Sequence, residues 1–335
     1  LDVQHIKWLK EGNQAIGKPE ASSPSSESVL NDIEYLLLRQ LNDFSIANSN
    51  VTYQTFTGDI KTLEIEHLKW QNFGERHRAD GVIGIADNDI NSLTVKADFI
   101  ELGDLSRISG DFFVSAENLQ VTPWLTKYLK DKVGIAQGHA SFNSWITLDK
   151  GQPKNAYLEI LPSEISWNKE AQHSLMLEHG IVSMAPSGSG WQVNAHSLRL
   201  RTDDTPWPLL DAAFKFNEEN WQLNVSELNV ATLTPFVHLM PESDKLNQWL
   251  DTVQLGGRVE DIRVSIGEDL SSMRFSANLE DGAMQQWELL PELHHLSAQL
   301  SGSLDQINAR VSLIDDELPY GDVFQAPLKI RQAQV

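Results

Sequence analysis

An acidic stretch from Asp87 to Asp98 spaces oxygen ligands in the manner of a calcium-binding loop. Asp87, Asp89, Asn91 and Asp98 fall at positions 1, 3, 5 and 12 of such a loop. Position 6 is Ser92, where the sharp turn of the loop needs Gly, and position 12 lacks the bidentate Glu. We therefore interpret the stretch as a hairpin turn with solvated carboxylates that continues into a strand, and we expect no metal site.

Other candidate reactive groups are equally weak. The ten histidines are scattered and form neither a His-x-His nor an HExxH motif. The sequence SGSG at 187–190 lies between two strand patterns and is better interpreted as a hairpin turn than as a phosphate-binding loop. The acids of 315–317 offer a carboxylate pair of the kind that glycosidases use, but three consecutive acids are typical of a solvated loop. We expect no catalytic residue, no cofactor and no enzymatic activity.

Apolar residues alternate with polar ones along most of the chain, which predicts strands with one apolar face. The clearest hairpin runs through Phe214 and Phe216, turns at 217–220 and resumes at Trp221. In the segment 138–148, alternation places Phe142 and Ile146 on one face and an aromatic residue, Trp145, on the other. Turn residues recur every 8–12 positions, so the expected class is all-β, with a mostly antiparallel, twisted and elongated sheet.

Helical signals are few and short. Ser28 can cap an amphipathic segment that ends at Leu41, and two Thr-Pro pairs, at Thr122 and Thr234, suit an N-cap followed by Pro in the first turn. The stretch 11–27 is rich in Ser, Pro and Gly and is expected to be a mobile loop.

The chain also repeats itself loosely. The phrase His-aliphatic-Lys-Trp occurs at 5–8 and at 67–70, and a pattern of strand, Thr-Pro helix, linker, glycine and strand begins at Asn118 and again at Glu227. We therefore expect one continuous repetitive segment of a longer protein, with approximate units 1–117, 118–226 and 227–335.

Charge and composition exclude several classes of partner. With 26 basic and 47 acidic residues the net charge is −21, which disfavours nucleic acid and flat docking on an anionic membrane. Cysteine is absent, which removes disulfides and thiol chemistry. No apolar run reaches the roughly 18 residues of a membrane-spanning helix. The chain begins with Leu in a strand-like pattern, so any export signal or anchor is expected to lie outside it.

Two motifs carry a family resemblance. The pattern L-x-V-x-x-L-x-P-F-x-x-L at 228–239 is followed by WLDTVQLGGRVEDIRV at 249–264, and both resemble the AsmA-like envelope proteins of Gram-negative bacteria. The segments 287–313 and 58–85 fit neighbouring parts of the same pattern.

The resemblance implies a protein anchored in the inner membrane, whose sheet curls into an open groove across the periplasm and carries phospholipid toward the outer membrane. This chain would be a periplasmic segment without the anchor. Its partners would be phospholipid, the membranes at the ends of the full-length protein, and neighbouring segments joined end to end through strand edges. The residues expected to line the groove are Val95, Phe99, Phe142, Ile146, Phe214, Phe216, Leu223, Val225, Val264, Ile266, Phe275 and Leu279.

Two other functions remain compatible with the sequence. One is a structural or adhesive envelope module in which the apolar faces pack together in a closed sandwich without lipid. The other is a carbohydrate-binding or carbohydrate-active module that uses some of the ten tryptophans as sugar platforms. The first differs from a lipid carrier in whether the apolar face is open, and the second requires exposed aromatics beside paired carboxylates.

Overall fold

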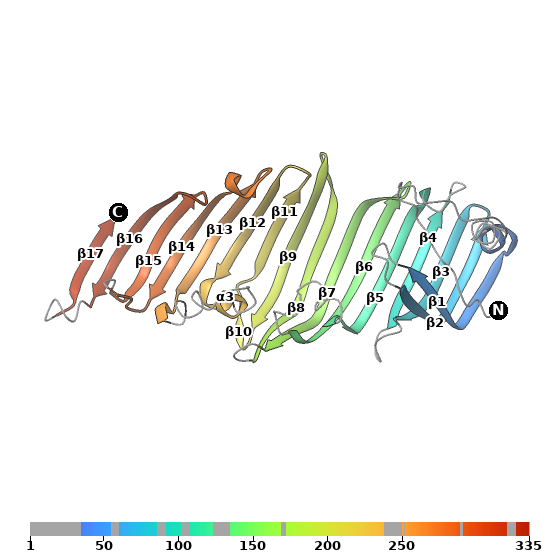
Figure 1. Ribbon diagram of the computed structural model, residues 1–335, viewed down its shortest axis with the longest axis horizontal. Helices are drawn as coiled ribbons and strands as arrows, with labels where there is room; N and C mark the ends of the chain where they lie inside the picture. Colours follow the sequence, from blue (N-terminus) through green and yellow to red (C-terminus); the bar gives the residue numbers. More distant parts are fainter. Residues whose placement is uncertain are drawn as a thin grey trace, which may run out of the picture. The chain divides into compact units, whose positions relative to one another are not determined.

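Strands dominate the computed structural model (Figure 1), which describes residues 35–54, 60–85, 92–101, 107–122, 135–168, 172–237, 250, 252–288, 291–319 and 326–334. All seventeen strands belong to one sheet, and every pairing between described strands is antiparallel. The expected all-β class with few short helices is therefore confirmed. The strands are β1 (Asp43–Gln54), β2 (Ile60–Phe73), β3 (Arg76–Ile85), β4 (Ser92–Ile100), β5 (Ser109–Gln120), β6 (Ile135–Asp149), β7 (Gln152–Asn168), β8 (Gln172–Ser187), β9 (Gly190–Thr202), β10 (Thr205–Pro206), β11 (Leu210–Phe216), β12 (Trp221–Asn229), β13 (Gly256–Ile266), β14 (Arg274–Met284), β15 (Leu293–Gly302), β16 (Ile307–Leu318) and β17 (Leu328–Gln334).

The chain divides into two compact units, one formed by Leu1–Gln120 with Ser141–Ala156 and the other by Val121–Ala140 with Tyr157–Val335. We call them unit 1 and unit 2. The three sequence units 1–117, 118–226 and 227–335 stay a prediction, and the expected loop 11–27 lies outside the described residues.

Each unit is a ladder of sequential neighbours. In unit 1, β1 to β5 pair in chain order, and side-chain hydrogen bonds such as Ser115 to Asn143 join β5 to β6. In unit 2, β8 pairs with β9, β9 with β11, and β11 to β17 follow in order (Figure 1). Such local pairing follows from the tight turns between strands, for example at Asn217, whose side-chain oxygen accepts the Glu219 and Asn220 amides.

Polar residues with left-handed backbone interrupt many of the strands. Left-handed conformations are costly for most residues and are tolerated best by Asn, Asp and Gly. Register shifts accompany several of them, as between Glu260 and Arg263 of β13, where Asp261 lies, so these positions are β-bulges that bend and twist the strand. Left-handed residues within the strands are Asn48, Asn118, Ser197, Asp261, Asp281, His295 and Asp315.

The bulges change the step of the apolar pattern. In β13 the apolar residues Val264 and Ile262 are two apart, but the next one on the same face is Val259, three residues on, where it faces Leu279 of β14. Because a strand alternates with period two, a step of three would normally move a side chain to the opposite face. The extra residue at Asp261 absorbs that shift and keeps the face apolar.

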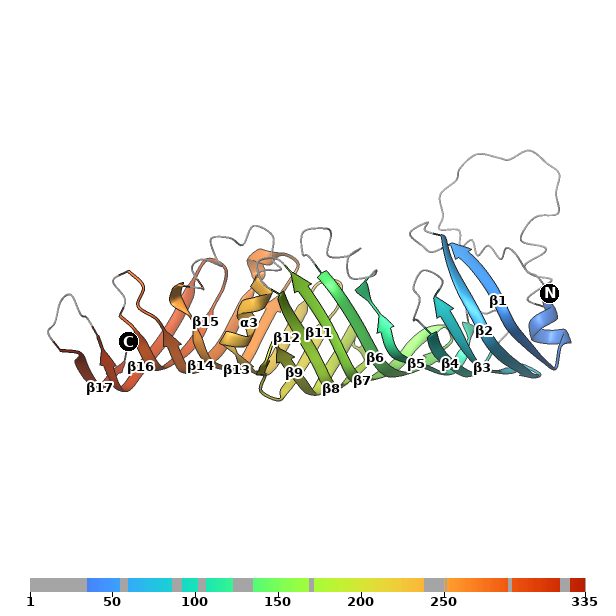
Figure 2. The same cartoon turned by 90° about the horizontal axis from the view of Figure 1, so that it is seen from below.

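Short helical segments with described bounds are η1 (Leu36–Gln40), α3 (Val230–Val237) and η3 (Leu270–Ser272). α3 lies against the sheet (Figure 2), where Phe236 packs on Trp167 and Trp207. The expectation that Thr234 caps this helix is wrong, since the helix starts earlier and contains Pro235. The Asn229 side chain accepts the Ala231 amide at 3.0 Å, so Asn229 takes the capping role.

The other helical expectations are only partly visible. η1 falls within the predicted segment 28–41, of which residues from Tyr35 onward are described. Of the predicted helix at Thr122, only its first residue is described, and that residue is helical.

Two loop interpretations have opposite outcomes. The SGSG segment is the predicted hairpin turn between β8 and β9, with Gly188 at positive φ. The acids of 315–317 are not a solvated loop, because they lie inside β16. Asp316 is buried there, and its carboxylate accepts the backbone amides of His294 and Glu317, which compensates its burial.

One end of unit 1 encloses a buried polar cluster. Asn72 donates from Nδ2 to the carbonyls of Leu37 and Leu41, which ties η1 to β2. Arg39 of η1 forms an ion pair with the buried Glu101, and His77 is fully buried with Nδ1 at 2.6 Å from Asn72 Oδ1. Burial, reinforced by the positive charge of Arg39, lowers the pKa of His77 below its ordinary value.

Replacement of Asp261 by Val is expected to destabilise the chain, because a β-branched residue cannot adopt the left-handed backbone cheaply. The expected loss is about 1–2 kcal/mol of unfolding free energy, measured by urea denaturation. Asp261→Gly should cost less than about 0.5 kcal/mol. Ser265→Val, four residues along the same strand with extended backbone, is the matched control and should be near neutral. Equal losses for the Val and Gly variants at 261 would contradict the bulge argument.

The buried His77 predicts a pH-dependent stability. Its folded-state pKa lies below the unfolded value of about 6.5, so the unfolded chain binds the proton first as the pH falls. The neutral His77 ring makes its full contribution to the free energy of unfolding above about pH 6.5. This contribution is lost as the pH falls toward the folded-state pKa, by at most about 1.4 kcal/mol per pH unit. His77→Phe keeps the ring between Trp70 and Phe99 but removes the titration. Thermal midpoints measured from pH 7.5 to 5 should fall less steeply for this variant. Parallel profiles would show that His77 does not carry the effect.

Candidate functional site

The apolar face of unit 2 is a continuous set of cross-strand rows. One row runs through directly paired residues of five adjacent strands, namely Val193, Phe214, Leu223, Val264 and Phe275. Directly opposed side chains on one face contact each other, so these residues form one apolar surface. Neighbouring rows extend it on both sides through Trp191, Phe216, Trp221 and Ile266, and through Ala195, Ala212, Val225 and Ile262.

This face is only partly shielded from solvent. Leu223 in the middle of the row is 37 % exposed, and Trp221 is exposed as well. Among the described residues there is a single sheet, with no second sheet to cover the apolar side chains. α3 packs on Trp167 and Trp207, beyond the central row. An uncovered apolar surface of this width is typical of a binding surface.

Unit 1 has an equivalent apolar face. Leu68, Gly81, Val95 and Val114 are paired in one row, and the next row carries Trp70 and Phe112. Ile146 and Phe142 of β6 project to this side, because Thr147 and Asn143 bond across the opposite side to β5.

The predicted lining residues therefore share one face within each unit, and one of them departs from the expected role. Phe99 is only 5 % exposed and packs against Trp70, His77 and Phe112. It belongs to the interior of unit 1. Val95, Phe142 and Ile146 are half-buried on the face of unit 1, and the other eight residues lie together on that of unit 2: Phe214, Phe216, Leu223, Val225, Val264, Ile266, Phe275 and Leu279.

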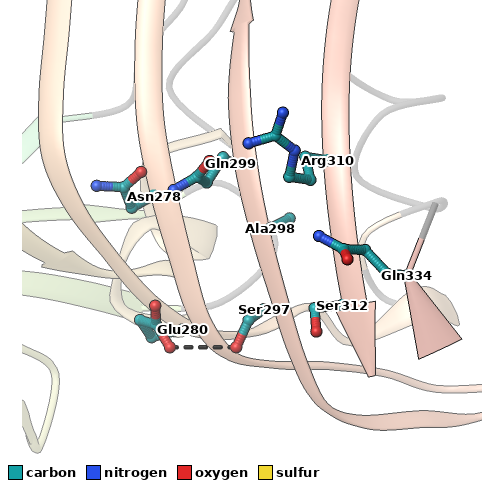
Figure 3. Close-up of a pocket in the computed structure, with 8 residues that line it drawn as sticks. All are labelled: Asn278, Glu280, Ser297, Ala298, Gln299, Arg310, Ser312 and Gln334. Carbon is teal, nitrogen blue, oxygen red and sulfur yellow. Dashed lines mark hydrogen bonds between the residues drawn. The ribbon is translucent and has the colours of Figure 1, made fainter. Parts of the chain in front are cut away.

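The opposite faces are polar. In unit 2, amide, hydroxyl and guanidinium side chains line a hollow that includes Asn278, Gln299 and Arg310, and Ser297 donates to Glu280 (Figure 3). In unit 1, Arg76 and Arg78 both bind Asp98, and the hydrogen bond from Arg76, aided by Arg78, holds the pKa of Asp98 below its ordinary range. In each unit the charges are thus segregated from the apolar face.

The described residues can be compared with the calcium-like pattern of the sequence. They contain no cluster of three or more His, Asp or Glu side chains placed to hold a metal ion. Asp98, the twelfth position of the calcium-like pattern, is engaged by two guanidinium groups, while Asp87, Asp89 and Asn91 lie outside the described residues. No helix in the described ranges has the length and hydropathy needed to cross a membrane.

The bulge positions are the feature that sequence reasoning missed. Their signal is a three-residue step between apolar residues with a polar residue inside the gap. Phe112, Val114, Ala116 and then Leu119 show it around Asn118, and Ala195 and Leu198 show it around Ser197. A strict period-two count assigns the residues beyond the gap to the wrong face.

Comparison with known proteins identifies the family of the chain. The family model described as "YhdP protein" matches residues 3–335. The chain is 28 % identical to the intermembrane phospholipid transporter YhdP of Escherichia coli (strain K12), over an alignment that covers 94 % of this chain and 26 % of the relative. The chain thus spans about a quarter of the length of that relative. No solved structure matches it significantly. The family expected from the motifs at 228–239 and 249–264 is confirmed, and the chain belongs to the YhdP family.

Proposed function

We propose that this chain is a segment of a bridge-like lipid transfer protein, in which the apolar faces of its sheet shield phospholipid acyl chains. The main evidence is the partly exposed apolar row of paired residues that begins with Val193 on β9 and ends with Phe275 on β14. This row crosses five adjacent strands. The name of the Escherichia coli relative, an intermembrane phospholipid transporter, supports the same cargo.

The physical basis is the incomplete burial of that face. Apolar surface that stays in water costs about 25 cal/mol per Å², and an acyl chain laid across the row removes that cost for both partners. The row offers no charge or directed hydrogen bond along its length, so a chain can slide between equivalent positions. A surface of this kind suits transport better than tight capture, and it requires no reaction chemistry.

The proposal places the segment in the periplasm, within a longer protein that reaches membranes at its ends. Strand edges support such continuity. In the described pairings β1 bonds to β2 and β17 to β16, and we infer that the other edge of each strand pairs with a neighbouring segment. Free edges are normally covered in native proteins, and pairing with flanking strands would cover these.

Val264→Asp is expected to remove bound lipid without unfolding the sheet. On an open face the carboxylate meets water whenever lipid is absent, so the thermal midpoint should stay within about 3 °C of the wild type, a change of roughly 1 kcal/mol. Phospholipid per chain, measured by extraction and mass spectrometry, should fall at least about fivefold, because burial of a charge against acyl chains is costly. Phe216→Asp should behave in the same way.

Ser265→Asp is the matched control, since it adds the same charge one residue away on the polar face, opposite Arg274. Its lipid content and midpoint should equal those of the wild type. If Val264→Asp lowers the midpoint by about ten degrees or more, the side chain is enclosed in a core, and a closed structural module replaces the lipid carrier. If the midpoint and the lipid content both stay unchanged, the face does not bind lipid.

A further inference from the structure

Two aromatic side chains lie in contact on the polar face of unit 1, surrounded by charged side chains. Phe113 of β5 and Trp145 of β6 lie with ring centroids 5.2 Å apart and planes tilted by 52°. Trp145 is 42 % exposed, although this face otherwise carries ion pairs such as that between Lys96 and Asp80. Cross-strand stabilisation explains the contact between the rings but not the exposed indole surface.

The pair borders a hollow whose polar groups are held in place. Its lining includes Lys96, Asp98, Asp111, Thr147 and both rings. Asp98 and Asp111 are directly opposed on β4 and β5, so their like charges require compensation. Arg76 and Arg78 supply it for Asp98, and the Thr147 hydroxyl donates to Asp111 Oδ1 at 2.8 Å. Asp111 therefore has a fixed position and retains acceptor sites beyond the one that Thr147 uses.

The chemistry of the hollow selects among ligand classes. The adjacent carboxylates of Asp98 and Asp111 disfavour an anion. Arg76 and Arg78, which pair with Asp98, and Lys96, which pairs with Asp80, add positive charge beside the hollow and disfavour a cationic ligand. A lipid tail in the hollow would strip water from the carboxylates of Asp98 and Asp111, which disfavours such a ligand. A pyranose ring fits both the aromatic and the charged part of the hollow. Its C–H face packs on an indole, while its hydroxyls donate to carboxylates and accept from an ammonium.

We propose that this hollow binds a neutral oligosaccharide, with one sugar ring on Trp145 and its hydroxyl groups on Asp111 and Lys96. Ser115 and Asn143, hydrogen-bonded to each other across the same two strands, continue the polar surface beyond the aromatic pair for a following sugar. The site faces away from the apolar side of unit 1, so it is independent of lipid binding.

The test is saturation-transfer NMR on the 335-residue chain with three probes: tetrasaccharides of β-1,4-linked N-acetylglucosamine, β-1,4-linked glucose and α-1,4-linked glucose. At least one should bind with a Kd on the order of 0.1–1 mM, with saturation strongest at the C–H protons of one ring face. Trp145→Ala should weaken binding at least about tenfold, and Asp111→Asn about threefold or more. Trp221→Ala, an exposed tryptophan on the apolar face of unit 2, is the control and should bind like the wild type.

The proposal is overturned if none of the three probes binds below about 10 mM, or if Trp145→Ala binds as tightly as the wild type. Should Trp145→Ala fail to fold, Trp145→Phe and Asp111→Ala decide the question. Both leave the strand pairing intact, and both should weaken binding at least about threefold. Unchanged affinity in those two variants would equally overturn the proposal.

Discussion

A single layer of sheet has to keep one side apolar across many strands while those strands bend, and the left-handed bulge residues meet both demands. Each bulge adds one residue to its strand, which increases the local twist and moves the following side chains by one position. The apolar pattern steps by three at the same place, as from Ile262 to Val259 around Asp261. Sequence and backbone therefore compensate each other, and the apolar face continues through the bend.

The absence of a covering layer in the described part of the chain determines how the sheet is stabilised. Most apolar side chains remain half-exposed, so a strand depends on its ladder hydrogen bonds and on same-face neighbours more than on a deep core. Complete burial is confined to local sites, such as Phe99 within its aromatic cluster and Trp167 beneath Phe236. The remaining apolar surface is what an acyl chain can occupy, so the same feature that limits stability provides the binding surface.

The polar faces complement this arrangement. Charges on one side of a thin sheet keep it soluble without entering the apolar rows, and ion pairs such as Arg76 with Asp98 fix side chains at defined positions. On this ordered background the exposed Trp145 beside Asp111 is unusual, and it provides the combination of aromatic platform and carboxylate that the sequence suggested in general terms without locating.

The sequence by itself determined the all-β class, the hairpins at 187–190 and 217–220, the segregation of apolar from polar side chains, and the family, because these depend on local alternation, turn chemistry and recognisable motifs. It misplaced the start of α3, where Asn229 and not Thr234 is the cap, and it assigned Asp316 to a loop although that carboxylate is buried in β16. Only the tertiary structure decided which apolar residues stay accessible. Phe99 and Leu223 have the same alternating pattern, yet neighbouring rings enclose the first, whereas the second is 37 % exposed in the described part of the chain. Periodicity specifies the face on which a side chain lies, whereas exposure depends on what residues distant in the sequence place above that face.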